Sequence, residues 1–87
     1  MGGEPLCENN SFLTLLVITE MKKLIPDLKV WVWTGYEWDD VSSRDDRTHT
    51  ILEMINGIVT GPYVEALRDI TLPMRGSSNQ RVIYLKD

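Results

Sequence analysis

Residues 29–36 carry the sequence KVWVWTGY, the clearest strand signal in the chain. From Val30 to Trp33 every residue is apolar and either β-branched or aromatic, which favours a strand. A strand without polar alternation is typical of parallel sheets, which are covered on both faces. Thr34 and Gly35 then interrupt the pattern. The stretch therefore predicts a strand over 29–33, buried on both sides.

A helix is predicted before this strand, over residues 12–25. Asn9, Asn10 and Ser11 offer cap oxygens at its start, and Pro26 ends it. Its apolar residues recur at spacings of three and four, which predicts one inward face. This face comprises Leu13, Leu16, Val17, Met21 and Leu24. The stripe is widened by Phe12, Leu15 and Ile18, so we expect burial on more than one side.

Helices and strands continue to alternate after the strand. We expect a helical turn over 37–41, a polar loop over 42–47 and a helix over 48–55. Further patterns predict a strand over 57–60, a short helix over 63–68, an irregular stretch over 70–80 and a strand over 81–85. This alternation predicts an α/β fold with mostly parallel strands, formed by residues 1–87 as one domain.

Composition narrows the function classes. The chain has 87 residues and a formal charge of −4, without a basic cluster, so a nucleic-acid partner is not expected. Cys7 is the only cysteine, and one thiol cannot form an internal disulfide or hold a zinc ion or a cluster alone. The first residues do not read as a signal peptide, and the apolar run over 15–18 is too short to cross a bilayer. We expect a cytoplasmic protein.

Two segments could bind a ligand. In Gly2-Gly3-Glu4-Pro5, the glycines allow close backbone approach and the carboxylate can pair with an ammonium group. Residues 75–80, RGSSNQ, combine a guanidinium group, hydroxyls and amides that could bind an anion or a polar ligand. Taken alone, each segment is better explained as an ordinary turn or a solvated loop.

Taken together, these segments resemble one family. Gly2-Gly3-Glu4-Pro5-Leu6 resembles the glycine-rich motif that follows the third strand of radical S-adenosylmethionine (SAM) enzymes. Residues 30–36, 55–69 and 74–80 resemble the fourth strand, the next strand and loop, and the C-terminal signature of the anaerobic ribonucleoside-triphosphate reductase-activating proteins. The matches follow the family's order and span nearly the whole chain.

The resemblance implies a fold and a reaction. The family adopts a partial βα barrel and binds a 4Fe-4S cluster and SAM. An electron from the cluster cleaves SAM to a 5′-deoxyadenosyl radical, which generates a glycyl radical on the partner, the large subunit of the anaerobic reductase. By this resemblance the chain corresponds to the C-terminal half of an oxidoreductase, and the cofactors supply the difficult chemistry.

The resemblance also implies residue roles. The backbone of Gly2 and Gly3 and the carboxylate of Glu4, followed by Pro5, would face the amino group of SAM. Two strand-end residues, Thr34 and Thr60, would approach SAM as well, although the family often has Asp in place of Thr60. The signature residues have no assigned role: Arg75, Ser77, Asn79 and Gln80. The family commonly has Trp in place of Met74.

The main departure from the family is the lack of its Cys-x3-Cys-x2-Cys motif. We therefore expect an incomplete domain, without the first strands and the cluster-binding loop, that does not bind the cluster and is inactive alone. No residue of the chain is assigned as catalytic or metal-binding. A barrel cut through its sheet exposes a strand edge, so a loose or oligomeric state is expected.

Two alternatives stay open. The chain could be a non-catalytic module that docks on the reductase or complements a separate N-terminal half. It could also be an α/β nucleotide-binding domain unrelated to the family. Other conspicuous residues have simpler interpretations: Trp31 and Trp33 as core or interface residues, His49 as exposed, and Cys7 as a free thiol.

Overall fold

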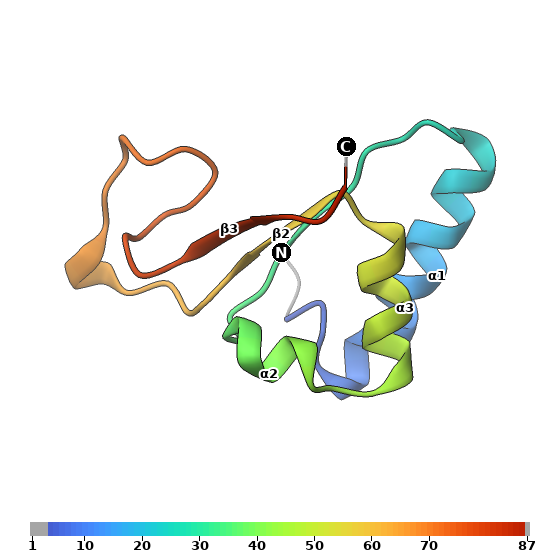
Figure 1. The fold of residues 1–87 in the computed structure, drawn as a ribbon, viewed down its shortest axis with the longest axis horizontal. Helices are drawn as coiled ribbons and strands as arrows, with labels where there is room; N and C mark the ends of the chain where they lie inside the picture. The colour runs from blue at the N-terminus through green and yellow to red at the C-terminus, as the bar shows by residue number, and fades with distance from the viewer. Residues whose placement is uncertain (1–3, 87) are drawn as a thin grey trace.

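The fold is a small α/β arrangement in which helices cover one face of a three-stranded sheet (Figure 1). The structure is a computed structural model, and it describes residues 4–86. Its elements, in chain order, are α1 (Glu8–Leu24), β1 (Trp31–Trp33), α2 (Trp38–Ser42), α3 (Asp46–Met54), β2 (Gly57–Thr60), a 3-10 turn (Glu65–Leu67) and β3 (Arg81–Tyr84). The predicted α/β class is confirmed, and the strand over 57–60 has the predicted bounds.

The sheet is mixed, in the order β1-β2-β3. β1 and β2 are parallel, with Val32 opposite Ile58, whereas β2 and β3 are antiparallel, with Ile58 opposite Ile83. The prediction of mostly parallel strands is therefore wrong for β3. A parallel connection needs a crossover, usually a helix, and the segment between β2 and β3 contains only one 3-10 turn.

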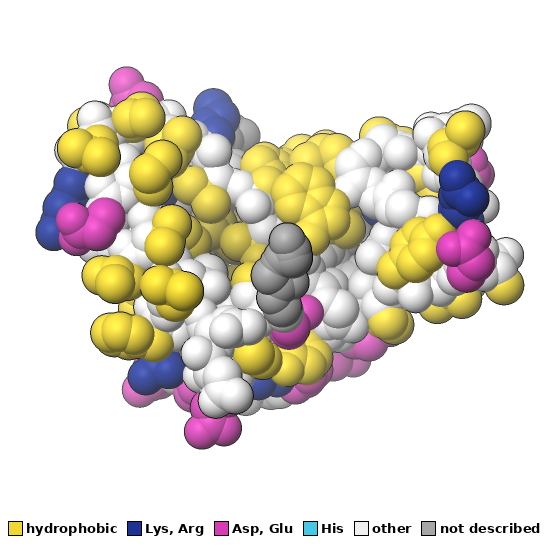
Figure 2. All heavy atoms as spheres, turned by 180° about the vertical axis from the view of Figure 1, so that it is seen from behind, with side chains coloured by type: hydrophobic (Ala, Val, Ile, Leu, Met, Phe, Trp, Pro, Cys, Tyr) yellow, Lys and Arg dark blue, Asp and Glu magenta, His cyan; other side chains and the backbone are white. Residues whose placement is uncertain are grey.

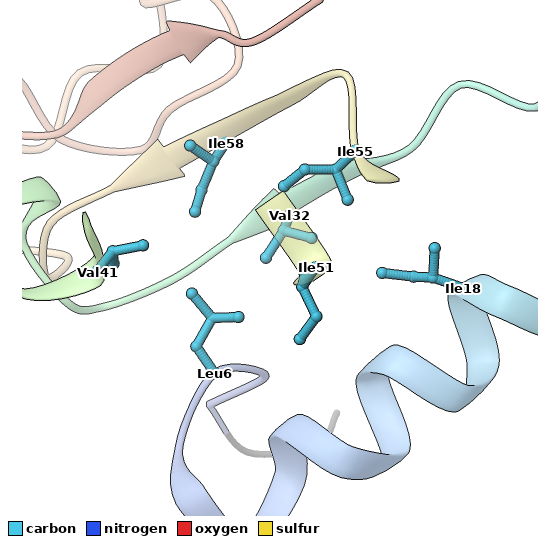
Figure 3. Close-up of a cluster of buried hydrophobic side chains, with 7 residues drawn as sticks. All are labelled: Leu6, Ile18, Val32, Val41, Ile51, Ile55 and Ile58. Carbon is cyan, nitrogen blue, oxygen red and sulfur yellow. The ribbon is translucent and has the colours of Figure 1, made fainter. Parts of the chain in front are cut away.

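Seven apolar side chains form the core between the sheet and the helices (Figure 3). They come from every layer and point toward one another: Leu6, Ile18, Val32, Val41, Ile51, Ile55 and Ile58. Burying a side chain of this size contributes about 1.5–3 kcal/mol relative to exposure. The core thus fixes the segment before α1 against the sheet, which decides where Glu4 lies.

The long helix differs from its prediction in two ways. It begins at Glu8, so Asn9, Asn10 and Ser11 lie inside the helix, and Cys7 occupies the cap position without a side-chain hydrogen bond. The predicted inward face is wrong, because its members are exposed, from 41% for Met21 to 80% for Leu24. Among the apolar residues of α1 only Ile18 is buried, since α1 packs on α3 through the other side.

Hydrophobic side chains consequently gather over the α1 end of the molecule, as Figure 2 shows from behind. The sheet face opposite the core is also open. Trp33 of β1 is 48% exposed there, which contradicts the prediction that this strand is covered on both faces. Among the described residues, no helix has the length and hydropathy needed to cross a bilayer.

Candidate functional site

The candidate site lies where the parallel strands β1 and β2 end. Thr34 follows β1, and its backbone N–H donates to the Val59 carbonyl at 2.9 Å, next to Thr60. Carboxyl ends of parallel strands meet at one edge of a sheet, where ligands of α/β folds commonly bind. The fold therefore brings two predicted residues, Thr34 and Thr60, to the same edge.

The Glu4 carboxylate reaches this edge from the segment before α1. Its Oε2 accepts hydrogen bonds from the Thr34 hydroxyl at 2.6 Å and from the Leu6 backbone N–H at 3.0 Å. Its Oε1 accepts one from the Gly35 backbone N–H at 2.6 Å. Hydrogen bonds to an ionised acceptor are stronger than neutral ones, so they hold the carboxylate in one orientation. The structure thus places Glu4 and Thr34 together.

The hydroxyl of Thr34 orients this carboxylate. It donates to Glu4 and accepts from the Tyr36 backbone N–H at 3.2 Å, and Thr34 is buried. Since a carboxylate has about four acceptor positions, Oε1 of Glu4, with one donor, keeps capacity for another. An ammonium group is the natural donor for that position, because it also carries the opposite charge.

Thr60 presents a different situation. Its side chain is 0% exposed, and within residues 4–86 its Oγ1 has no hydrogen-bond partner. Buried polar groups are nearly always paired, so an unpaired one needs an explanation. One explanation is that this hydroxyl pairs with a ligand. The next residue, Gly61, has φ +102°, a conformation that favours glycine, and its N–H donates to the Tyr36 carbonyl at 2.7 Å.

A second carboxylate lies nearby and was missed by the sequence analysis. The Oε1 atom of Glu37 would lie 3.4 Å from a Cβ added to Gly61. Glu37 is the cap residue of α2, and in the sequence it was assigned only to a helical turn. No pattern in the sequence signals its proximity to Gly61. Gly61 follows β2, which begins 20 residues after Glu37, so the contact arises only through the fold.

The C-terminal signature closes the loop between β2 and β3. The Oε1 of Gln80 accepts from the backbone N–H groups of Gly76 and Ser77, at 2.9 and 3.2 Å, and its Nε2 donates to the Gly61 carbonyl at 3.0 Å. Gln80 is buried, so these bonds satisfy groups that would otherwise be unpaired. Gln80 therefore ties both ends of the loop together.

The other signature residues pair with the same loop. The Ser77 hydroxyl accepts from the Val64 N–H at 3.2 Å, Arg75 Nη1 donates to the Gln80 carbonyl at 2.8 Å, and Asn79 Nδ2 donates to the Pro62 carbonyl at 2.8 Å. In the described residues, Arg75 Nε and Asn79 Oδ1 have no partner. These contacts explain the composition of the signature by loop closure.

The remaining predicted residues are sequence neighbours of Glu4. Gly2 and Gly3 fall outside the described residues. The Pro5 carbonyl accepts a hydrogen bond from the Thr14 hydroxyl at 2.8 Å, which ties the segment to α1.

Comparison with known proteins agrees with the sequence resemblance. The family described as "4Fe-4S single cluster domain" matches residues 1–83. The chain belongs to this family. It is 35% identical over 85 residues to the anaerobic ribonucleoside-triphosphate reductase-activating protein of Escherichia coli K12, covering 98% of this chain and 53% of that protein. The protein of the same name from Haemophilus influenzae is 34% identical with the same coverage.

A phage relative extends the comparison. The anaerobic ribonucleoside-triphosphate reductase-activating protein of Enterobacteria phage T4 is 31% identical over 81 residues, or 93% of this chain and 48% of that protein. No solved structure matches. The chain spans about half the length of the curated relatives it matches. The resemblance to the activating proteins is thereby confirmed.

The described residues do not provide the ligands for the 4Fe-4S cluster that the family's description names. Within residues 4–86, no three His, Cys, Asp or Glu side chains lie close enough together to hold a metal ion. Cys7 is a partly buried free thiol. A 4Fe-4S cluster is held by several thiolates, so the described part of the chain lacks a ligand set for it. The Glu4 carboxylate, by contrast, can accept a hydrogen bond from an organic ligand with an ammonium group.

Proposed function

We propose that this chain provides the SAM-binding part of an activase that generates a glycyl radical on the anaerobic ribonucleoside-triphosphate reductase. The observation that carries the proposal is the Glu4 carboxylate, which the Thr34 hydroxyl and the Gly35 N–H hold at the end of β1. The names of the relatives support the activase assignment. The reductase is accordingly the proposed partner.

In this proposal the ammonium group of SAM donates to Oε1 of Glu4. Thr34 keeps the carboxylate oriented by donating to Oε2, and does not itself need to contact the ligand. The hydroxyl of Thr60, which lacks a partner in the described region, would pair with a polar group of the ligand. By the resemblance, the backbone of Gly2 and Gly3, followed by Pro5 in the sequence, would also face the amino group of SAM.

The proposal includes the architecture. The three strands, with α1 and α3 on one face, would form part of a radical SAM-type partial βα barrel. Bound SAM would supply the radical chemistry once an electron is delivered. Because residues 4–86 contain no ligand set for the cluster, its thiolates would have to come from outside this range. We expect no SAM cleavage by residues 4–86 alone.

Isothermal titration calorimetry with SAM tests the site. Glu4→Gln removes the charge that pairs with the ammonium group, and we expect at least a tenfold loss of affinity, since a charged hydrogen bond contributes about 1.5–3 kcal/mol. Glu8→Gln is the matched control, because Glu8 is exposed on the first turn of α1. Equal SAM affinity in Glu4→Gln and the unmodified chain would refute the assignment of Glu4.

The exposed face of α1 favours a second candidate function, a docking module. Monomeric proteins seldom leave a contiguous apolar surface of this kind uncovered. The face comprises six residues of α1 and the residue that follows it: Phe12, Leu13, Leu16, Val17, Met21, Leu24 and Ile25. In addition, β1 lies at the edge of the sheet formed by the described residues, where another strand could pair.

The occupant of this face would be the reductase or the half of the relatives' length that this chain does not match. Co-purification with each, using the unmodified chain and a Leu16→Asp variant, tests the module. Retention that is lost in Leu16→Asp supports it. Retention that is unaffected by Leu16→Asp would exclude this face as the docking surface.

A further inference from the structure

A second set of functional groups lies at the opposite end of the sheet, where β1 and β2 begin and β3 ends. A cavity of about 420 Å³ at this end is lined by Lys22, Lys29 and Lys86, together with Pro26, Asp27, Leu28 and Asn56. Three positive charges thus face one acidic residue, although the whole chain carries a formal charge of −4. Lining of one sign concentrates oppositely charged ligands.

None of these lysines is neutralised by a carboxylate within residues 4–86. Lys22 Nζ donates to the Leu28 carbonyl at 3.4 Å, and Lys86 Nζ donates to the Glu53 carbonyl. The ion pairs of the described residues involve other basic side chains: Lys23, Arg44 and Arg68. The lysine charges therefore remain available to an anion.

Asn56 holds the segments that carry these lysines. Its Oδ1 accepts from the Val30 N–H at 2.8 Å, and its N–H donates to the Val30 carbonyl at 2.8 Å, next to Lys29. Its carbonyl accepts from the N–H groups of Leu85 and Lys86, at 2.9 and 3.1 Å. Asn56 is buried, so the backbone around the cavity is fixed before any ligand arrives.

Aromatic rings continue the site. A neighbouring cavity of about 300 Å³ is lined by Lys29, Asn56 and Lys86 again, and by Trp31 and Tyr84. The two rings meet edge to face at 5.1 Å between centroids, with an interplanar angle of 87°. Tyr84 is 73% exposed, so its ring offers a free surface beside the lysines. Aromatic surfaces of this kind stack on nucleobases.

We propose that this end of the sheet binds a nucleoside phosphate, with the phosphates at Lys22, Lys29 and Lys86 and the base at Trp31 and Tyr84. Lysine ammonium groups pair with phosphate oxygens, and the aromatic rings lie directly beside them. SAM is a poor candidate for this site, because it lacks a phosphate and carries a positive sulfonium group. The proposal does not depend on the activase assignment.

Calorimetric titrations of the full chain with ADP, inorganic pyrophosphate and adenosine test the site. We expect saturable ADP binding that is tighter than that of either part. Lys29→Ala/Lys86→Ala should weaken ADP and pyrophosphate at least tenfold, whereas Lys23→Ala, which removes an α1 lysine outside both cavities, should change neither. Tyr84→Ala should weaken ADP and leave pyrophosphate unchanged.

The contrary results are equally distinct. ADP binding that does not saturate, or that is unaffected by Lys29→Ala/Lys86→Ala, overturns the site. Equal loss of ADP and pyrophosphate in Tyr84→Ala overturns the stacking role, as does an ADP affinity no higher than that of pyrophosphate. Competition with SAM separates the two proposals, since ADP should remain bound when SAM is added.

Discussion

The two ends of the β1–β2 pair differ in charge and in how their polar groups are used. At the carboxyl end, the negative charge of Glu4 is held by donors from its own chain, and one buried hydroxyl, that of Thr60, lacks a partner there. At the amino end, lysines line a cavity around the fixed backbone of Asn56. The difference teaches that the two ends of one small sheet can offer opposite charges to a ligand.

The two largest effects on stability are expected from one change at each end, and the first lies at the amino end. A Cβ added to Gly57 would lie 2.3 Å from Cη2 of Trp31, so Gly57→Ala must displace the indole ring from the sheet. We expect a loss of about 1–3 kcal/mol in the free energy of unfolding, measured by urea denaturation.

The control for Gly57→Ala lies at the carboxyl end. A Cβ added to Gly35 would meet Glu4 Oε1 at 3.4 Å, an ordinary contact, so Gly35→Ala should cost less. If Gly35→Ala destabilises the fold as much as Gly57→Ala, the close packing of Trp31 on Gly57 is not the cause.

A pair of isosteric changes at the carboxyl end should have opposite effects on stability. Thr34→Val removes a donor to Glu4 and leaves the Tyr36 N–H unpaired, which should cost about 1–3 kcal/mol. Thr60→Val removes a buried hydroxyl without a partner in the described region, so stability should stay the same or rise. Urea denaturation of both variants measures the contrast.

Ligand affinity tests whether the unpaired hydroxyl of Thr60 serves ligand binding or has no such role. If its hydroxyl pairs with SAM, Thr60→Val should bind SAM about tenfold more weakly while unfolding no more easily. Unchanged SAM affinity in this variant would remove Thr60 from the proposed site, which would then rest on Glu4 alone.

The smallest expected effect is a loss of folding stability at acidic pH. It sets the lowest pH at which ligand binding at the two ends can be compared. The pKa of Asp45 is lowered from its usual 3.8. The larger cause is the hydrogen bond with the Thr48 backbone, and the hydrogen bond with the Thr48 side chain adds to it. A carboxyl whose pKa is lower in the folded state stabilises the fold above its unfolded pKa. That contribution is lost as the pH falls through the folded value.

Asp45→Ala tests this effect on the cap of α3. The variant should be less stable than the unmodified chain at pH 7, because Asp45 accepts from the Thr48 N–H at 3.0 Å. The gap between the two should narrow as the pH falls below about 4. Thermal melts across this range measure it, and a gap independent of pH would contradict the assignment.

Sequence reasoning named two residues that meet at the carboxyl end, but none of the group that meets at the amino end. Glu4 and Thr34 were assigned through the resemblance, and the fold brings them together at 2.6 Å. Glu37 was missed because its proximity to Gly61 is a tertiary contact. The lysine cavity was missed for the same reason, since Lys29 and Lys86 are brought together through Asn56.

Periodicity predicted the elements better than their burial. Asp45 caps α3 three residues before its predicted start, and the direction of β3 depends on its connection, which apolar spacing does not encode. On α1 the apolar spacing predicted a helix correctly, yet Leu16 and Val17 are exposed. A pattern shows that a face is apolar, but its burial depends on what packs there.

The most direct test of the central claim, that the carboxyl end binds SAM, is an amide NMR titration of the chain with SAM. The account predicts saturable shifts at the N–H groups of Leu6 and Gly35, which donate to Glu4, and of Gly61, which follows Thr60, with little change at Lys29 and Lys86. Saturable shifts confined to Lys29 and Lys86, or no saturable shift anywhere, would contradict it.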